Sequence, residues 1–404
     1  MNRFPHLLLL AMLLVLAACG AATPAVAPLP AIAPQPVEQP AAPLPVAGTT
    51  DSVVAPELPA PYPTASPAGR TDNLHAAEPL APIAHPTMVA GSGENAMPQP
   101  VLPDQQQPAT AIRAGEIDDN ADFAAYLDYL AGYRGAGVLP FDVSQRILIT
   151  VSNQRQEPIL DAQVRIYAGQ QQLFSGRTYA GGTTIFFPAA AHSSQIGELR
   201  LVAEKGQSRS EQLIQPGSRR VDLVLEDAAG PRTPLQVDLV FLLDATGSMG
   251  DEIGRLQQTI GDIAARIDRI EPRPDLRFGL VSYRDRGDEY VARIDADFTG
   301  DVNRFSNALW QVRADGGGDT PEDLNEGLRL AIEELRWRDD AVRLVFLVAD
   351  AAPQLGYGQQ FDYLVGAREA VARGIRIYPI AASNTDESAE YVFRQLAQQT
   401  LGRF

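Results

Sequence analysis

From Leu235 to the last residue, apolar stretches of strand length alternate with amphipathic stretches of helix length. Residues 237–243 form a nearly continuous apolar run, which is typical of a central parallel strand buried on both faces. A helix is predicted next, because apolar residues between 253 and 270 recur at helical spacing. The alternation predicts an α/β fold, with a doubly wound and mostly parallel sheet over residues 235–404.

The remaining elements of this region follow from the same two periodicities. Strands are predicted at 276–283, 291–294, 342–349 and 375–380, and helices at 302–312, 324–337, 361–373 and 389–400. Ligands of such sheets bind beyond the carboxyl ends of the strands, so the residues at those ends are the first candidates for a functional site.

Two absences exclude common catalytic machinery from this region. The only lysine is Lys205 and the last histidine is His192, so residues 206–404 contain neither side chain. A Walker-type phosphate loop requires its lysine and a Ser-His-Asp triad requires its histidine. Neither can be built there.

Oxygen-bearing side chains follow three of the predicted elements. Asp244, Thr246 and Ser248 come directly after the first strand, Thr320 follows a run of three glycines, and Asp350 follows the strand 342–349. Parallel strands end at the same edge of a sheet, so these side chains are expected to converge. A set of hard oxygen donors without nitrogen or sulfur suits Mg²⁺, Mn²⁺ or Ca²⁺.

These three pieces resemble the metal-ion-dependent adhesion site of von Willebrand factor type A (vWA) domains. The resemblance covers residues 235–404 and implies a vWA domain. It also implies that Thr246, Ser248 and Thr320 bind the cation through their hydroxyls, and that Asp244 and Asp350 bind it directly or through water. Such a site leaves one coordination position for a carboxylate of a protein partner.

Each piece also has a purely structural interpretation. Ser248 could cap its helix, with Asp251 in the first turn. Thr320 before Pro321 could cap the next helix, with Glu322 and Asp323 complementing the helix dipole. Asp350 could be a turn residue.

Several neighbouring residues are interpreted differently from the ligands. Asp315 and Asp319 are predicted to be solvated loop acids, and residues 283–285 are predicted to line the rim of the site.

Two departures from the vWA pattern concern Ala351-Ala352-Pro353, where many members have Gly, and the chain end at Phe404, where many continue into a last strand and helix.

The first 111 residues are predicted to export and tether the rest. Residues 1–19 have an apolar stretch too short to span a bilayer, and Leu16-Ala17-Ala18-Cys19 resembles the lipobox of bacterial lipoproteins. Lipidation of Cys19 is expected, the alternative being an ordinary signal peptide with an incidental cysteine. The chain has 20 of its 32 prolines between residues 21 and 110, and residues 20–111 are predicted to be a disordered Pro/Ala-rich linker.

Two further segments precede the α/β region. Residues 112–140 are predicted to contain a short helix, because Phe123, Tyr126, Leu127 and Leu130 share one helical face. Short strands separated by turn residues predict an all-β sandwich over 141–230. It resembles the carboxypeptidase-regulatory-like and other immunoglobulin-like sandwiches, and is expected to act as a spacer.

The predicted function is binding rather than catalysis. The formal net charge of −17 argues against nucleic acid as a partner, and membrane attachment is expected through the lipid anchor only. The favoured hypothesis is a lipid-anchored extracytoplasmic protein, at the cell surface or periplasmic face, whose cation binds an acidic group of a protein partner. The alternative is a structural or assembly module without metal-dependent binding. A haloacid-dehalogenase-like phosphatase is disfavoured, because Thr246 stands where a second acid is needed.

Overall fold

The computed structural model describes residues 115–191, 198–318, 320–383 and 385–404. The predicted signal peptide, Cys19 and the predicted linker lie outside the described residues. Within the described ranges, no helix combines the length and the apolar character needed to cross a membrane.

The predicted short helix is present as α2 (Phe123–Gly132). It begins where the Asp122 carboxylate accepts a hydrogen bond from the Ala125 amide at 3.1 Å. Tyr126 is completely buried on its inner face. The segment before α2 contacts the C-terminal part of the chain, because Asp119 forms a buried ion pair with Arg394 at 2.7 Å.

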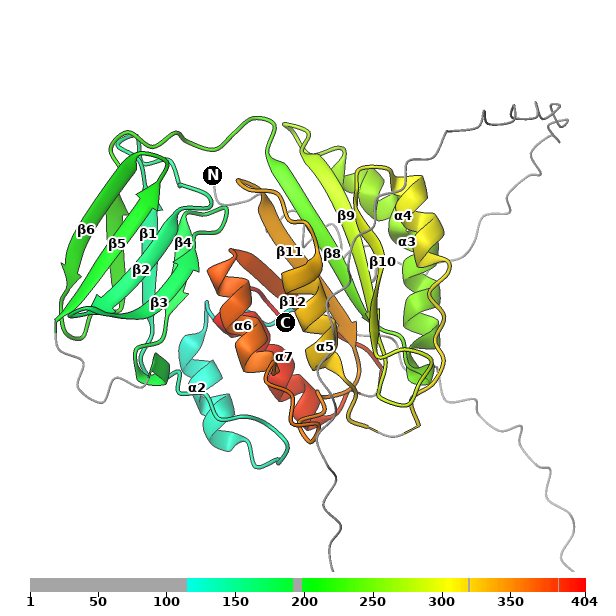
Figure 1. The fold of residues 1–404 in the computed structure, drawn as a ribbon. Helices are drawn as coiled ribbons and strands as arrows, with labels where there is room; N and C mark the ends of the chain where they lie inside the picture. The colour runs from blue at the N-terminus through cyan, green and yellow to red at the C-terminus, as the bar shows by residue number, and fades with distance from the viewer. Residues whose placement is uncertain (1–114, 192–197, 319, 384) are drawn as a thin grey trace, which may run out of the picture. The chain divides into compact units, whose positions relative to one another are not determined.

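Seven strands between residues 147 and 224 form two sheets around one hydrophobic core (Figure 1). The strands are β1 (Ile147–Ser152), β2 (Gln163–Ala168), β3 (Gln171–Arg177), β4 (Thr183–Phe186), β5 (Leu199–Lys205), β6 (Ser208–Ile214) and β7 (Arg220–Val224). One sheet has the order β4-β1-β7 and the other β3-β2-β5-β6. β1 and β7 alternate buried and less buried residues over their whole length, because only one face of their sheet meets the core. The likeness to a particular immunoglobulin-like family stays a prediction.

The C-terminal region contains one five-stranded sheet with the order β10-β9-β8-β11-β12. Its strands are β8 (Gln236–Asp244), β9 (Asp275–Tyr283), β10 (Ala292–Thr299), β11 (Val342–Ala349) and β12 (Ile375–Ala381). All neighbours are parallel except the antiparallel pair β9 and β10. A mixed α/β fold with a mostly parallel sheet was predicted for this region and is confirmed.

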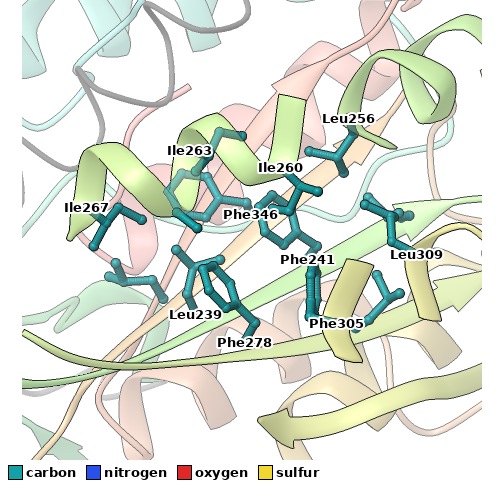
Figure 2. Close-up of a cluster of buried hydrophobic side chains, with 14 of the residues drawn as sticks. Leu239, Phe241, Leu256, Ile260, Ile263, Ile267, Phe278, Phe305, Leu309 and Phe346 are labelled. Carbon is teal, nitrogen blue, oxygen red and sulfur yellow. The ribbon is translucent and has the colours of Figure 1, made fainter. Parts of the chain in front are cut away.

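Helices cover both faces of this sheet, which is why its central strands are apolar on both sides (Figure 1). The helices are α3 (Gly250–Ile267), α4 (Val302–Leu309), α5 (Leu324–Arg329), α6 (Tyr363–Ala372) and α7 (Glu387–Gln399). Figure 2 shows one of the two cores, in which isoleucines and leucines of α3 and α4 pack on phenylalanines of the sheet. Phe241 from β8 and Phe305 from α4 lie there with ring centroids 5.7 Å apart.

The structure corrects three predicted element boundaries. The helix predicted at 324–337 is an α-helix only to Arg329, and a short π-helix (Leu330–Glu334) follows. The helix predicted at 302–312 ends at Leu309, and the strand predicted near 291–294 continues to Thr299. β10 is an edge strand with partly exposed residues, so its apolar pattern is weak and understates its length.

Candidate functional site

The strand order places the candidate residues at a switch point of the sheet. β8 runs between β9 and β11, and all three are parallel, so their carboxyl ends meet at one edge. In register, Asp244 is paired with Tyr283, and Leu243 is paired with Val348, two residues before Asp350. In open α/β sheets, ligands bind at the carboxyl edge, at the point where the strand order reverses.

The loop after β8 folds its polar side chains onto one carboxylate. The Thr246 amide and the Thr246 hydroxyl both donate to Oδ1 of Asp244, at 3.0 and 2.7 Å. The hydroxyls of Thr246 and Ser248 lie 3.4 Å apart. Asp244 and Thr246 are buried, whereas Ser248 is exposed. Three of the five predicted ligands are therefore gathered by local hydrogen bonds.

The glycine run of the second loop lies directly against the first loop. Gly316 accepts a hydrogen bond from the Gly247 amide at 3.1 Å, and the Gly317 amide donates to the Asp288 carboxylate. Gly316 and Gly317 have φ values of 73° and 69°, a left-handed conformation that favours glycine. A Cβ on Gly317 would lie 3.1 Å from both the Thr246 Cβ and the Glu322 Oε1. The glycines thus allow the second loop to approach Thr246 closely.

Backbone hydrogen bonds join the second loop to the third. The Glu322 amide donates to the Ala352 carbonyl at 3.1 Å, and the Gln354 amide donates to the Glu322 carbonyl at 2.7 Å. These bonds form a parallel bridge between Glu322 and Pro353. The Ala351-Ala352-Pro353 segment, which departs from the vWA pattern, therefore fixes where the second loop ends.

Two acids of this edge, Asp244 and Glu322, are buried. Burial raises the pKa of Asp244 to about 6, against the lowering effect of the Thr246 hydrogen bonds, and the charge of Asp350 adds to the rise. Burial also raises the pKa of Glu322 to about 8, helped by the charges of Asp244, Asp285, Asp288 and Asp350. Among the described residues, no arginine or lysine forms an ion pair with Asp244, Glu322 or Asp350.

Neither predicted helix cap is present. α3 begins after Met249, with Ser248 in a preceding turn and no side-chain cap, so the capping interpretation of Ser248 is wrong. α5 begins at Leu324, and its N-cap is Asp323, which accepts from the Glu326 amide at 3.2 Å. Thr320 lies too far before this helix to cap it.

The structure places the second predicted ligand loop differently from the first. Thr320 is exposed, in a bend that precedes the bridged Glu322. Asp350 follows β11, whose Val348 pairs with Leu243 of β8, so it lies at the same edge of the sheet as Asp244. Asp315 is exposed as predicted and accepts from the Gly316 amide at 2.9 Å, whereas Asp319 lies outside the described residues.

Residues predicted for the rim lie beneath the site instead. Tyr283 is completely buried, and its hydroxyl donates to Oδ2 of Asp244 at 3.4 Å. Arg284 is also buried and donates to the carbonyls of Ala245 and Arg313, at 3.1 and 2.9 Å, so it holds the loop backbone. Both follow from their position at the carboxyl end of β9, next to β8. Sequence reasoning assigned Glu322 to a helix dipole and not to the site, although it comes four residues after the last glycine of the run, Gly318.

The donor set fits a hard divalent cation. Hydroxyl and carboxylate oxygens are the ligands that Mg²⁺ and Ca²⁺ prefer, and Oε2 of Glu322 is buried without a hydrogen-bond partner. Asp244, Thr246, Ser248 and Asp350 would hold such an ion, with one further oxygen from the second loop. In the described part of the chain, no three acidic, histidine or cysteine side chains converge closely enough to hold a metal by themselves. Hydroxyl oxygens are therefore needed to complete the site.

Comparison with known proteins identifies the class of this domain. Residues 238–359 match the von Willebrand factor A domain family, so a vWA domain is present, as the motif predicted. Domains of this class are interaction or adhesion modules.

The matched relatives are longer proteins, and the similarity covers a small part of each. The chain is 31% identical over 115 residues to alpha-protein kinase vwkA of Dictyostelium discoideum, covering 28% of this chain and 18% of that protein. It is 32% identical over 116 residues to human von Willebrand factor A domain-containing protein 7, covering 29% of this chain and 12% of the relative. The chain thus spans less than a fifth of the length of these relatives. Proximal thread matrix protein 1 from the mussel byssus aligns with 41% of this chain and 40% of its own, with a TM-score of 0.32 and 15% identity.

Proposed function

We propose that this protein binds a protein partner through a divalent cation held at the carboxyl edge of the vWA sheet. The cation is Mg²⁺, or Mn²⁺ or Ca²⁺, and the partner supplies an acidic group that completes its coordination. The observation that carries this proposal is the joining of three loops by direct hydrogen bonds beside Asp244, a buried acid that no arginine or lysine of the described residues neutralises. A bound cation would offset that charge.

The proposal predicts that partner capture depends on free cation. The full chain would be used to capture partners from solubilised membranes in Mg²⁺ and again in excess chelator. Partners that are lost on chelation, and lost also with Asp350→Ala, support the proposal. Asp315→Ala is the matched control, because Asp315 is an exposed acid of the neighbouring loop. Capture that is insensitive to chelator would refute it.

A second candidate function is a structural or assembly module in which the cation is absent or only stabilises the fold. One feature favours it: buried ion pairs join strand β11 and helix α7 of the vWA region to the two preceding segments. Arg343 binds Asp161 at 3.0 Å and Arg394 binds Asp119 at 2.7 Å. Thermal melting discriminates the two, because a Mg²⁺-dependent rise that Asp350→Ala abolishes supports an ion at the site. Absence of any rise favours the assembly module.

We also propose that the protein is lipid-anchored outside the cytoplasm. Support comes from sequence alone, from the apolar stretch that ends at Cys19, the only cysteine of the chain. Metabolic labelling with a radioactive fatty acid should mark the wild-type chain and not Cys19→Ala. Labelling of both chains, or of neither, would contradict the anchor.

A binding role without catalysis is the last part of the proposal. It rests on the donor set of the site, which offers hydroxyls and carboxylates and, in residues 206–404, neither lysine nor histidine. A phosphatase assay in Mg²⁺ is the direct test. Turnover that Asp244→Ala abolishes would replace this proposal with an enzymatic one.

A further inference from the structure

Strand β7 forms an open edge of the sandwich. It is the last strand of the sheet β4-β1-β7, and among the described strands it pairs only with β1. The Leu148 amide donates to the Arg219 carbonyl at 3.0 Å, and the hydrogen bonds of a parallel pair recur at every second residue. The backbone N–H and C=O groups of Arg220, Asp222 and Val224 therefore point away from β1, towards the side on which no described strand pairs with β7.

The edge strand β12 of the vWA sheet, in contrast, is protected from further pairing. The Ile377 amide donates to the Thr400 hydroxyl at 3.0 Å, so it is not free to bind another strand. Pro379, two residues later on the same side, has no backbone N–H. β7 contains no proline, and no side chain of the described residues hydrogen-bonds to its outward backbone groups. An edge of this kind can pair with a strand of another chain.

The two ends of β7 carry opposite charges. Arg219 and Arg220 lie at its start, and Glu226 and Asp227 follow its last residue. All four of these residues are exposed. Arg220 pairs with Asp222 at 3.1 Å, whereas Arg219, Glu226 and Asp227 form no ion pair with any residue that the structure describes. Charges of both signs are therefore available to a partner, one sign at each end of the strand.

The basic end of β7 borders a groove that carries the same charge. The groove has a volume of about 1010 Å³ and lies between α2 and the ends of several sandwich strands. Arg146, Arg219 and Arg220 line it, and none of the described residues that line it is acidic. In a chain with 50 acidic and 33 basic residues, this is a local reversal of the overall charge. The group that binds at this end of β7 should therefore be acidic.

We propose that β7 is the interface through which two copies of this chain form a dimer. The two β7 strands pair antiparallel about a two-fold axis, so that the sheets β4-β1-β7 of both copies become one continuous sheet. The axis places the start of each β7 beside the end of the other. Arg219 and Arg220 of one copy then lie near Glu226 and Asp227 of the other copy, twice in each dimer. Val224, which is 39% exposed in the single chain, gains a cross-strand neighbour.

Charge complementarity favours a second copy over other occupants of this edge. A strand with one basic end and one acidic end is complementary to itself in the antiparallel orientation only. A long polyanion would meet the arginines but would be repelled by a chain whose formal net charge is −17. Because β7 has only five residues, the interface is small, and the dimer should be weak and should exchange with the monomer. The interface uses no residue of the carboxyl edge of the vWA sheet, so this proposal does not rest on the proposed function.

Sedimentation of the full chain at concentrations from about 1 μM to about 1 mM tests the dimer. Chelator and reductant are present, which exclude association through a cation or through Cys19. The wild type should pass from monomer to dimer as its concentration rises. The double variant Arg219→Glu, Arg220→Glu should weaken the dimer by about ten-fold or more, because attraction at both ends of the interface becomes repulsion.

Arg155→Glu is the matched control for this charge reversal, because Arg155 is an exposed arginine of the same sandwich that lies outside β7. It should leave the dimer unchanged. A wild type that stays monomeric up to the highest concentration would overturn the proposal. An effect of Arg155→Glu as large as that of the double variant would overturn it as well.

Mixing two charge-reversed chains tests the antiparallel arrangement itself. One chain carries Arg219→Glu and Arg220→Glu, so both ends of its β7 are acidic. The other carries Glu226→Arg and Asp227→Arg, so both ends of its β7 are basic. Each chain alone should dimerise about ten-fold more weakly than the wild type or worse, and the mixture should form a heterodimer about as strong as the wild-type dimer. A mixture that associates no better than its components would overturn the proposal, because a residue that only supports the fold is not rescued by mixing.

A proline tests whether the two copies pair through their backbones. Asp222→Pro removes an N–H that points away from β1 and leaves the hydrogen bonds to β1 in place. It should weaken the dimer by about five-fold or more, because a backbone hydrogen bond and the local approach of the strands are lost. Asp222→Ala keeps the N–H and is the matched control, with an expected change below about two-fold. Equal effects of the two variants would overturn backbone pairing, and if Asp222→Pro does not fold, the mixing experiment decides.

Discussion

The two ends of strand β8 each carry a completely buried aspartate, and the two are treated in opposite ways. Asp238, near the start, accepts hydrogen bonds from Arg277 at 2.9 and 2.7 Å and from the Arg338 side chain at 2.8 Å. Asp244, at the end, accepts from Thr246 and Tyr283 and from no other residue that the structure describes. One end of the strand is neutralised by the protein itself.

The difference supports the proposal that a cation binds at the carboxyl end of β8. Moving an unpaired carboxylate out of water costs free energy. The fold pairs Asp238 with two arginines but pairs Asp244 with none, so the buried charge of Asp244 is not neutralised. That end is also where three loops meet. The amino end of the sheet is a structural ion-pair centre, and the carboxyl end is where we propose the binding site.

The largest expected effect comes from removing the charge of Asp238, at the ion-paired end of β8. Asp238→Asn should lower the free energy of unfolding by about 3–5 kcal/mol, because two arginines lose their buried partner. Urea unfolding in the presence of a chelator measures this change in the free energy of unfolding. Asp244→Asn is the matched control and should leave this free energy unchanged or raise it, because no ion pair is lost. Equal losses in both variants would contradict the contrast between the two ends.

The next effect comes from adding Mg²⁺ to the same two variants. At about 100 times its dissociation constant, an ion that binds only the native state adds about 2.7 kcal/mol of stability. Wild type and Asp238→Asn should gain this increment, and Asp244→Asn should not. An increment that persists in Asp244→Asn would place the ion elsewhere.

A smaller effect is expected on acidification, at the ion pairs that join the sandwich to the sheet. Burial by itself raises the pKa of Asp161, but the charges of Arg343 and Arg177 outweigh it, so the pKa lies below its ordinary value. The stability it contributes, about 1–3 kcal/mol, is complete above the unfolded pKa of about 3.9 and is lost as the pH falls through the folded value.

Urea unfolding of Asp161→Asn between pH 7 and pH 3 checks this sign. The wild type should be more stable than the variant at pH 7, and the difference should shrink towards pH 3. Asp315→Asn is the control with an exposed acid and should show a smaller change. A difference that grows on acidification would show that the ion pairs do not outweigh burial.

The smallest expected effect concerns the hydroxyl beneath the site. Tyr283→Phe removes a long hydrogen bond to Asp244 and keeps the buried ring, so stability should fall by no more than about 1 kcal/mol. The Mg²⁺ increment should survive, since Tyr283 supplies no ligand. Tyr290→Phe is a control, because that hydroxyl, in the loop before β10, lies 3.0 Å from the hydroxyl of Ser282, the neighbour of Tyr283 in β9. Loss of the Mg²⁺ increment in Tyr283→Phe would give this tyrosine a larger role than positioning.

Local sequence predicted the elements that pack on both sides. β8 is apolar along its length because it is buried against a layer on each side, and α3 has apolar residues at helical spacing because one of its faces is buried. Both elements appear near their predicted bounds. The chemistry of the loop after β8 was also predictable, because Asp244, Thr246 and Ser248 interact within five residues. Boundaries failed where tertiary contacts override propensity, as at the π-helical turn after Arg329.

What the sequence determined by itself was the alternation of strands and helices and the kinds of oxygen donor that follow the strands, because both depend on neighbours within a few residues. Only the tertiary structure decided which acids are neutralised and where the second loop meets the third. Asp238 meets Arg338 from 100 residues away, and Glu322 is aligned by a bridge to Pro353. Such pairings depend on the distances between elements after folding, and no local pattern of residues encodes them.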